Sequence, residues 1–115
     1  MKISQIAQIL EGTFVTGEEL SDREVYSACG SDMMSDVLAY VKDQGVLITG
    51  LLNPQVIRTA EMMDMLCIVF VRGKTPTPEM VELAKQRNIV LITSPRRMFS
   101  ACGKLYSAGL QSGAF

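Results

Sequence analysis

Positively charged side chains follow two apolar runs of this sequence, and they are the residues best placed to do chemistry. They are Arg72, Lys74, Arg96 and Arg97. The first two come directly after the run 66–71, and the other two follow the run 89–93 and Ser94. Guanidinium groups and the free N–H groups of a helix N-terminus together bind phosphate or carboxylate. We predict a small-anion site here, with N–H groups near Ser94 and charge-assisted hydrogen bonds from the basic residues.

The predicted position of Arg96 and Arg97 in the first turn of a helix supports this site. Two cations there oppose the helix dipole, and a bound anion would relieve that conflict. The alternative left open by the residues is that both arginines point into solvent or pair across a subunit contact.

Other residues that could act in catalysis or bind metal give weaker patterns. Asp32 and Asp36 lie one helical turn apart, but Asp32 is better explained as a first-turn residue of a helix capped by Ser31. The three cysteines, Cys29, Cys67 and Cys102, are far apart and form no C-x-x-C motif. We expect them to be buried, reduced thiols rather than zinc ligands.

The chain contains no histidine, the commonest general base near neutral pH. Neither a G-x-G-x-x-G nor a G-x-x-x-x-G-K-[ST] motif is present, so two common classes of nucleotide-binding loop are excluded. We therefore predict no catalytic residue, no metal site and no cofactor.

Composition predicts a cytoplasmic protein that associates with itself. The 115 residues are 48% hydrophobic with mean hydropathy +0.22, which is high for a monomer of this size. The methionines at 33–34, 62–63 and 65 fit either gap-filling positions in the core or a subunit interface, and we expect some of them to line an interface. The formal net charge of -1 excludes non-specific nucleic-acid binding, and no apolar run is long enough to cross a membrane.

The charge is unevenly distributed along the chain. Residues 1–64 carry ten acids and four bases, whereas residues 65–115 carry two acids and seven bases. This asymmetry fits a head-to-tail contact between subunits, an anion site on the C-terminal half, or simply charges that mix on a solvated surface.

The elements that must position these residues alternate between strands and helices. Strands are expected at 13–16, 25–29, 46–49, 66–71 and 89–93, and the last three are apolar on both faces, as in parallel sheets covered by helices. Three helices are expected to begin where a capping residue precedes a proline, at Asn53-Pro54, Thr77-Pro78 and Ser94-Pro95. A fourth is expected from Ser31-Asp32 to about Lys42, and a fifth over 3–10.

These elements predict one α/β domain over residues 1–115. We expect three layers, with a mainly parallel sheet of four or five strands and helices on both faces. Residues 1–17 form a helix-strand leader, and residues 109–115 a flexible tail.

The motif Asp22-Arg23, followed by the acidic helix from Ser31, resembles the DRTGG domain family. The resemblance continues through the strand 46–49 and the later units at 66–69, 77–79 and 89–95, and the leader is similar to that of HPr kinase and Mur ligase N-terminal domains. Tyr26-Ser27-Ala28 stands about where stand-alone members tend to have Thr-Gly-Gly.

This resemblance implies a non-catalytic regulatory or ligand-sensing module that forms a homodimer. Relatives are found alone or attached to phosphate acetyltransferases and CBS-containing pyrophosphatases, in some cases beside an adenine-nucleotide site. It also implies a nucleotide or other small anion as ligand, and a redox or metabolic enzyme as partner. The alternative is a small enzyme that acts on a phosphorylated or carboxylated metabolite through the region from Arg72 to Arg97.

Overall fold

The computed structural model describes residues 1–40 and 45–112 and contains one five-stranded sheet. The strands are β1 (Thr13–Thr16), β2 (Ser27–Gly30), β3 (Gly45–Thr49), β4 (Cys67–Phe70) and β5 (Val90–Thr93). Their order in the sheet is β1-β5-β4-β3-β2. The four strands β2 to β5 are parallel, and β1 pairs antiparallel with β5 along one edge. The prediction of a mainly parallel sheet is confirmed.

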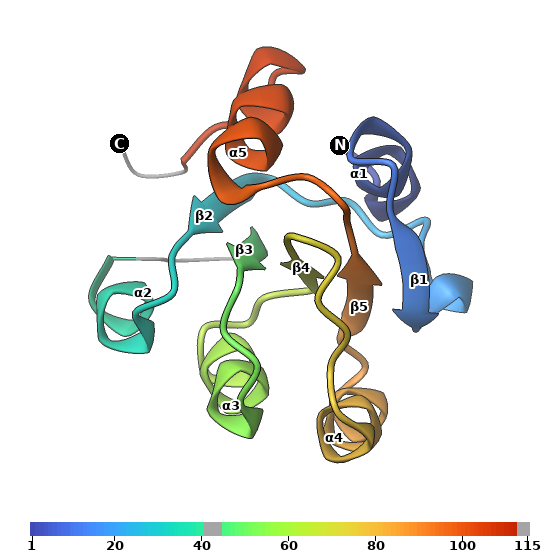
Figure 1. Cartoon of the computed structure of the whole chain (residues 1–115), viewed down its shortest axis with the longest axis vertical. Coiled ribbons are helices and arrows are strands. Elements are labelled where there is room, and N and C mark those ends of the chain that lie inside the picture. Colours follow the sequence, from blue (N-terminus) through green and yellow to red (C-terminus); the bar gives the residue numbers. More distant parts are fainter. Residues whose placement is uncertain (41–44, 113–115) are drawn as a thin grey trace.

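Helices cover both faces of this sheet. The helices are α1 (Ile3–Ile9), α2 (Met34–Tyr40), α3 (Pro54–Met62), α4 (Pro78–Arg87) and α5 (Met98–Ser107), with a short 3-10 helix η1 (Glu18–Leu20) after β1. Figure 1 shows α1 and α5 on one face and α2, α3 and α4 on the other. Both faces of β3, β4 and most of β5 are therefore buried, which explains their unbroken apolar sequences.

Each face has its own apolar core. On the α1 and α5 face, the core includes Ile6, Val69 and Leu105, all at most 1% exposed. On the opposite face it includes Ile57, Phe70 and Met80, which have no exposed surface. Alternate residues of a strand point to opposite faces, so Val69 and Phe70 contribute to different cores.

Two of the three predicted cap-proline starts are confirmed. The Asn53 side chain accepts a hydrogen bond from the N–H of Gln55 at 2.8 Å, and α3 begins at Pro54. The Thr77 hydroxyl accepts from the N–H of Met80 at 3.3 Å, and α4 begins at Pro78. These signals succeed because the capping atoms and their partners lie within one turn of the chain.

The start of α2 and residues 109–112 differ from the prediction, and the rest of the predicted tail, residues 113–115, lies outside the described residues. Helix α2 begins at Met34, after a turn in which the Ser31 hydroxyl accepts from the N–H of Met33 at 3.0 Å. The predicted end of this helix near Lys42 lies outside the described residues. Residues 109–112 were expected in a flexible tail, but Leu110 is 5% exposed and Gln111 accepts a hydrogen bond from the N–H of Ala28 at 2.9 Å. This segment covers part of the open edge of β2.

No helix among the described residues is long and apolar enough to cross a membrane.

Thr59 on α3 provides a test of packing on the α3 and α4 face. Its side chain is fully buried, and its hydroxyl has no hydrogen-bond partner among the described residues. The change Thr59→Val keeps the shape and removes this unpaired polar atom. We expect the free energy of unfolding to rise by about 1 kcal/mol, measured by urea denaturation. A loss of stability would contradict this description of the site.

Candidate functional site

Most of the basic residues singled out by the sequence lie where β4 and β5 end. We call the end of the sheet where the parallel strands finish the carboxyl edge, and the opposite end the amino edge. The loop after β4 and the loop after β5 are joined by two backbone hydrogen bonds. The Arg72 N–H donates to the Arg96 carbonyl at 2.7 Å, and the Gly73 N–H donates to the Ser94 carbonyl at 2.8 Å. The structure thus brings the loop of Arg72 and Lys74 beside the loop of Ser94 and Arg96.

Ser94 does not cap a helix, and the N–H groups around it are not free. Its hydroxyl donates to the carbonyl of Leu10 at 2.7 Å and accepts from the N–H of Arg96 at 3.1 Å. Its own N–H donates to the carbonyl of Phe70 at 2.9 Å. The Ser94 hydroxyl and N–H are therefore engaged within the fold, and a role for Ser94 in binding an anion stays a prediction. Its physical role is to hold the loop after β5 against the end of α1.

The positions of Arg96 and Arg97 relative to the helix also differ from the prediction. Helix α5 begins at Met98, so Arg97 is its N-cap residue and Arg96 lies outside the helix. The carbonyls of Ser94 and Arg96 accept hydrogen bonds from the loop after β4, and this tertiary contact keeps the segment out of the helix. Arg96 forms an ion pair with Glu11, whereas Arg97 is exposed.

Gly50, at the end of β3, connects charged residues from two neighbouring loops. Its N–H donates to the Asp32 carboxylate at 2.6 Å, and its carbonyl accepts from Lys74 Nζ at 2.6 Å. The Thr49 hydroxyl donates to the same Asp32 carboxylate at 3.1 Å. A Cβ atom at Gly50 would lie 2.7 Å from the Arg72 guanidinium, so the Arg72 side chain lies over the end of β3.

Asp32 is the residue whose role sequence reasoning missed. The prediction placed it in the first turn of α2, but it precedes the helix and holds the end of β3 instead. The signal that could have found it is the polar pair Thr49-Gly50 directly after an apolar strand. In a parallel sheet, residues after neighbouring strands meet at one edge.

Arg72 and Arg97 are the basic residues of this edge that remain available to a ligand. Both are exposed, and among the described residues neither side chain has a hydrogen bond or ion pair. Helices α3, α4 and α5 begin at this edge, so the positive ends of their dipoles lie there too. The described residues contain no group of three metal-ligating side chains. The arrangement favours binding of an anion.

The thiols are poor nucleophiles. Burial raises the pKa of Cys67 far above the usual range for a thiol, and burial also raises the pKa values of Cys29 and Cys102. All three cysteines are free, but the prediction that they are buried holds only for Cys67, because Cys29 and Cys102 are partly exposed. Their thiolate fractions near neutral pH are low, which argues against a catalytic role.

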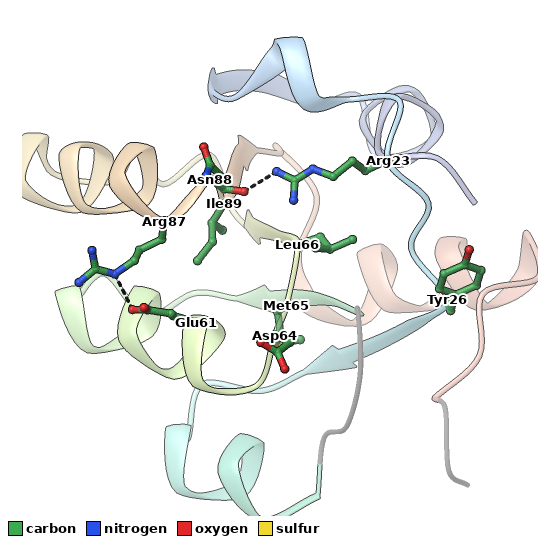
Figure 2. Close-up of a pocket in the computed structure, with 9 residues that line it drawn as sticks. All are labelled: Arg23, Tyr26, Glu61, Asp64, Met65, Leu66, Arg87, Asn88 and Ile89. Atoms are coloured by element: carbon green, nitrogen blue, oxygen red, sulfur yellow. Dashed lines mark hydrogen bonds and ion pairs between the residues drawn. The ribbon is translucent and has the colours of Figure 1, made fainter.

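The motif residues Asp22 and Arg23 lie at the opposite end of the sheet. Asp22 is 91% exposed and lies 3.8 Å from Lys2 Nζ. Arg23 donates to the carbonyl of Asn88 and lines a pocket of about 620 Å³ at the amino edge (Figure 2). The structure therefore does not bring the motif together with the basic residues of the carboxyl edge.

The remaining lining of this amino-edge pocket mixes charged and apolar residues. It comprises Tyr26, Glu61, Asp64, Met65, Leu66, Arg87, Asn88 and Ile89. Arg87 Nε lies 2.6 Å from the Glu61 carboxylate, so these two charges are paired on one wall (Figure 2). Met65 was grouped with candidate interface methionines but is 3% exposed, whereas Met33 and Met62 are 61% and 68% exposed.

Comparison with known proteins identifies one family and one informative structure. The model of the DRTGG domain matches residues 5–108. A crystal structure of the CBS and DRTGG domains of the regulatory region of Clostridium perfringens pyrophosphatase, complexed with the activator diadenosine tetraphosphate, is similar with a TM-score of 0.74 at 22% identity. The similarity covers 90% of this chain and 45% of that one. No curated protein matches.

The hydrogen bonds around Gly50 yield a test of the carboxyl edge. In Thr49→Val, the Asp32 carboxylate loses a donor and the N–H of Leu51, now 3.2 Å from the hydroxyl, loses its acceptor. We expect the free energy of unfolding to fall by about 1 to 3 kcal/mol, measured by urea denaturation. Thr59→Val makes the same chemical change at a hydroxyl without partners and serves as the control. Equal effects of the two substitutions would show that the network around Gly50 adds no stability.

Proposed function

Because the chain belongs to the DRTGG domain family, we propose that it is a ligand-sensing regulatory domain that works as a homodimer without catalysis of its own. The observation that carries this proposal is the shared fold with the regulatory region of a pyrophosphatase complexed with an activator. This chain spans 45% of that regulatory region, which also contains CBS domains. Regulation of a separate enzyme, redox or metabolic, is accordingly part of the proposal.

The proposed ligand is a nucleotide or another small anion that binds at the carboxyl edge. Arg72 and Arg97 supply the direct contacts, because their guanidinium groups are exposed and uncommitted among the described residues. The hydrogen bond between the Arg72 N–H and the Arg96 carbonyl keeps the two arginines on adjoining loops. Lys74 and Arg96 support the site indirectly, since the first holds Gly50 and the second pairs with Glu11.

The state of the polar groups supports a sensor rather than an enzyme. Asp32 and Ser94, the polar residues best placed at the carboxyl edge, are both held in hydrogen bonds within the fold. The chain has no histidine, and its thiols have raised pKa values. A cytoplasmic location completes the proposal, because three free cysteines stay reduced in that compartment.

Ligand binding is tested by thermal shift with diadenosine tetraphosphate, ATP, AMP and pyrophosphate at constant ionic strength. We expect at least one of these anions to raise the melting temperature in a saturable manner without being consumed. The double substitution Arg72→Gln and Arg97→Gln should weaken its binding by about tenfold or more, since each charge-assisted hydrogen bond contributes about 1.5 to 3 kcal/mol. The control is Arg58→Gln, an exposed arginine on α3. Unchanged affinity in the double variant would reject the site, and turnover would reject the sensor.

The homodimer is proposed to form through α5. Phe99 on this helix is 91% exposed, which is the largest exposed fraction among the exposed large apolar side chains of the described residues. Gly103 lies one turn further along α5, and a Cβ atom there would meet nothing within 4 Å. These two residues line a shallow hollow with Ile9 of α1. Two antiparallel copies of α5 would place Phe99 of each over Gly103 of the other, as a two-fold interface requires.

Light scattering at micromolar concentrations tests this interface. We expect the wild type to have the mass of a dimer and Phe99→Ser to have that of a monomer. Met62→Ser is the matched control, because Met62 is also an exposed apolar residue but lies on α3, across the sheet. A monomeric wild type would overturn the homodimer, and dissociation by Met62→Ser alone would place the interface on the other face.

A further inference from the structure

We propose that the amino-edge pocket is a second binding site, specific for a small organic cation. Its ligand carries a guanidinium or primary ammonium group on an apolar stem. This proposal is independent of the anion site, since it concerns the opposite end of the sheet. It is carried by the electrostatics of the pocket, by one uncommitted carboxylate, and by an apolar and aromatic lining.

Two helices end at this pocket. Helix α3 ends at Met62 with Met63 as its C-cap, and α4 ends at Arg87 with Asn88 as its C-cap. The C-terminus of a helix carries a partial negative charge, so both dipoles favour a cation here. The acidic helix η1 is at the same edge, since Gly17 at its start lies against Val90 at the start of β5.

Arg23 shows that a guanidinium group can bind at the C-terminus of a helix at this edge. Its guanidinium donates to the carbonyl of Asn88 and so places a cation at the end of α4 (Figure 2). The other basic residue of the lining, Arg87, is neutralised by its ion pair with Glu61. Arg87 is therefore neutralised by a carboxylate, whereas Arg23 is held by a backbone carbonyl and keeps its positive charge.

Asp64 is the acceptor that remains. It directly follows the C-cap of α3, in a left-handed conformation with φ of 53°. Its side chain is exposed, and no hydrogen bond or ion pair reaches it from the described residues. A cationic ligand at Asp64 would match, at the end of α3, the contact that Arg23 makes at the end of α4.

The rest of the lining suits an apolar stem next to the charge. Met65, Leu66 and Ile89 provide apolar side chains between the charged walls, and Tyr26 lines another side with 65% of its surface exposed (Figure 2). The face of a tyrosine ring attracts guanidinium and ammonium groups. A volume of about 620 Å³ accommodates such a ligand.

The test is an NMR titration of the ¹⁵N-labelled protein with butylguanidinium at constant ionic strength. Pentanoate, which has a similar stem and the opposite charge, is the control ligand. We expect saturable shifts from butylguanidinium at the amides of residues 61–66 and 87–89, and none there from pentanoate.

Three substitutions identify the groups that bind. Asp64→Asn should weaken binding by about tenfold, because it removes the charge while asparagine still tolerates the left-handed backbone. Tyr26→Leu should weaken it about twofold to fivefold. Glu82→Gln, which removes an exposed carboxylate from the middle of α4, should leave affinity unchanged.

A blocked Leu-Arg-Leu peptide distinguishes the sources of the cation. Binding about tenfold tighter than that of butylguanidinium would identify the ligand as an arginine side chain of a partner protein. Equal or weaker peptide binding, with butylguanidinium still saturating, would identify a free small cation. The proposal is overturned if neither probe gives saturable shifts, if pentanoate binds equally well, or if Asp64→Asn binds butylguanidinium as the wild type does.

Discussion

The parallel pairing of β2, β3, β4 and β5 is the constraint on which the rest of this structure depends. Parallel neighbours cannot be joined by tight turns, so each connection crosses a face of the sheet as a helix. The helices cover both faces and bury the central strands completely. The same connections fix the direction of every crossover helix: α3 and α4 start at the carboxyl edge and end at the amino edge. The two ends of the sheet therefore differ in electrostatic character before any charged side chain is considered.

Charged side chains of the two edges that have no partner among the described residues follow the same direction. Arg72 and Arg97 are exposed at the carboxyl edge, whereas the carboxylate of Asp64 and the acidic helix η1 lie at the amino edge. The uneven charge of the two sequence halves is thus only partly reflected in space, because Glu11 and Asp32 lie among the basic residues and hold their loops. The two sites that we propose, one for an anion and one for a cation, therefore lie at opposite ends of one small domain.

Local signals were predictable and long-range ones were not. The caps at Asn53 and Thr77 were identified because their hydrogen-bond partners lie two and three residues away. Ser94 has the same local signature, but its hydroxyl donates to Leu10, 84 residues away, and the helix begins later. The prediction of Asp32 in the first turn of a helix is wrong for the same reason, since its partner Gly50 follows β3 and lies 18 residues away. Tertiary hydrogen bonds thus outweighed a capping preference of about 1 kcal/mol at Ser94 and a helix-dipole preference of about 0.3 to 1 kcal/mol at Asp32.

The sequence by itself determined the alternation of strands and helices and the parallel character of the buried strands. These properties follow from apolar periodicity and residue type, which act over a few residues. Only the tertiary structure decided which basic side chains have no partner among the described residues. Arg96 pairs with Glu11 and Lys74 donates to the carbonyl of Gly50, and both partners lie far away in the sequence. The tertiary structure alone also revealed the amino-edge pocket, since Tyr26, Asp64 and Asn88 come from separate elements. Sites formed by residues far apart in the chain depend on how the sheet orders its strands, and that order is not encoded in any short stretch of sequence.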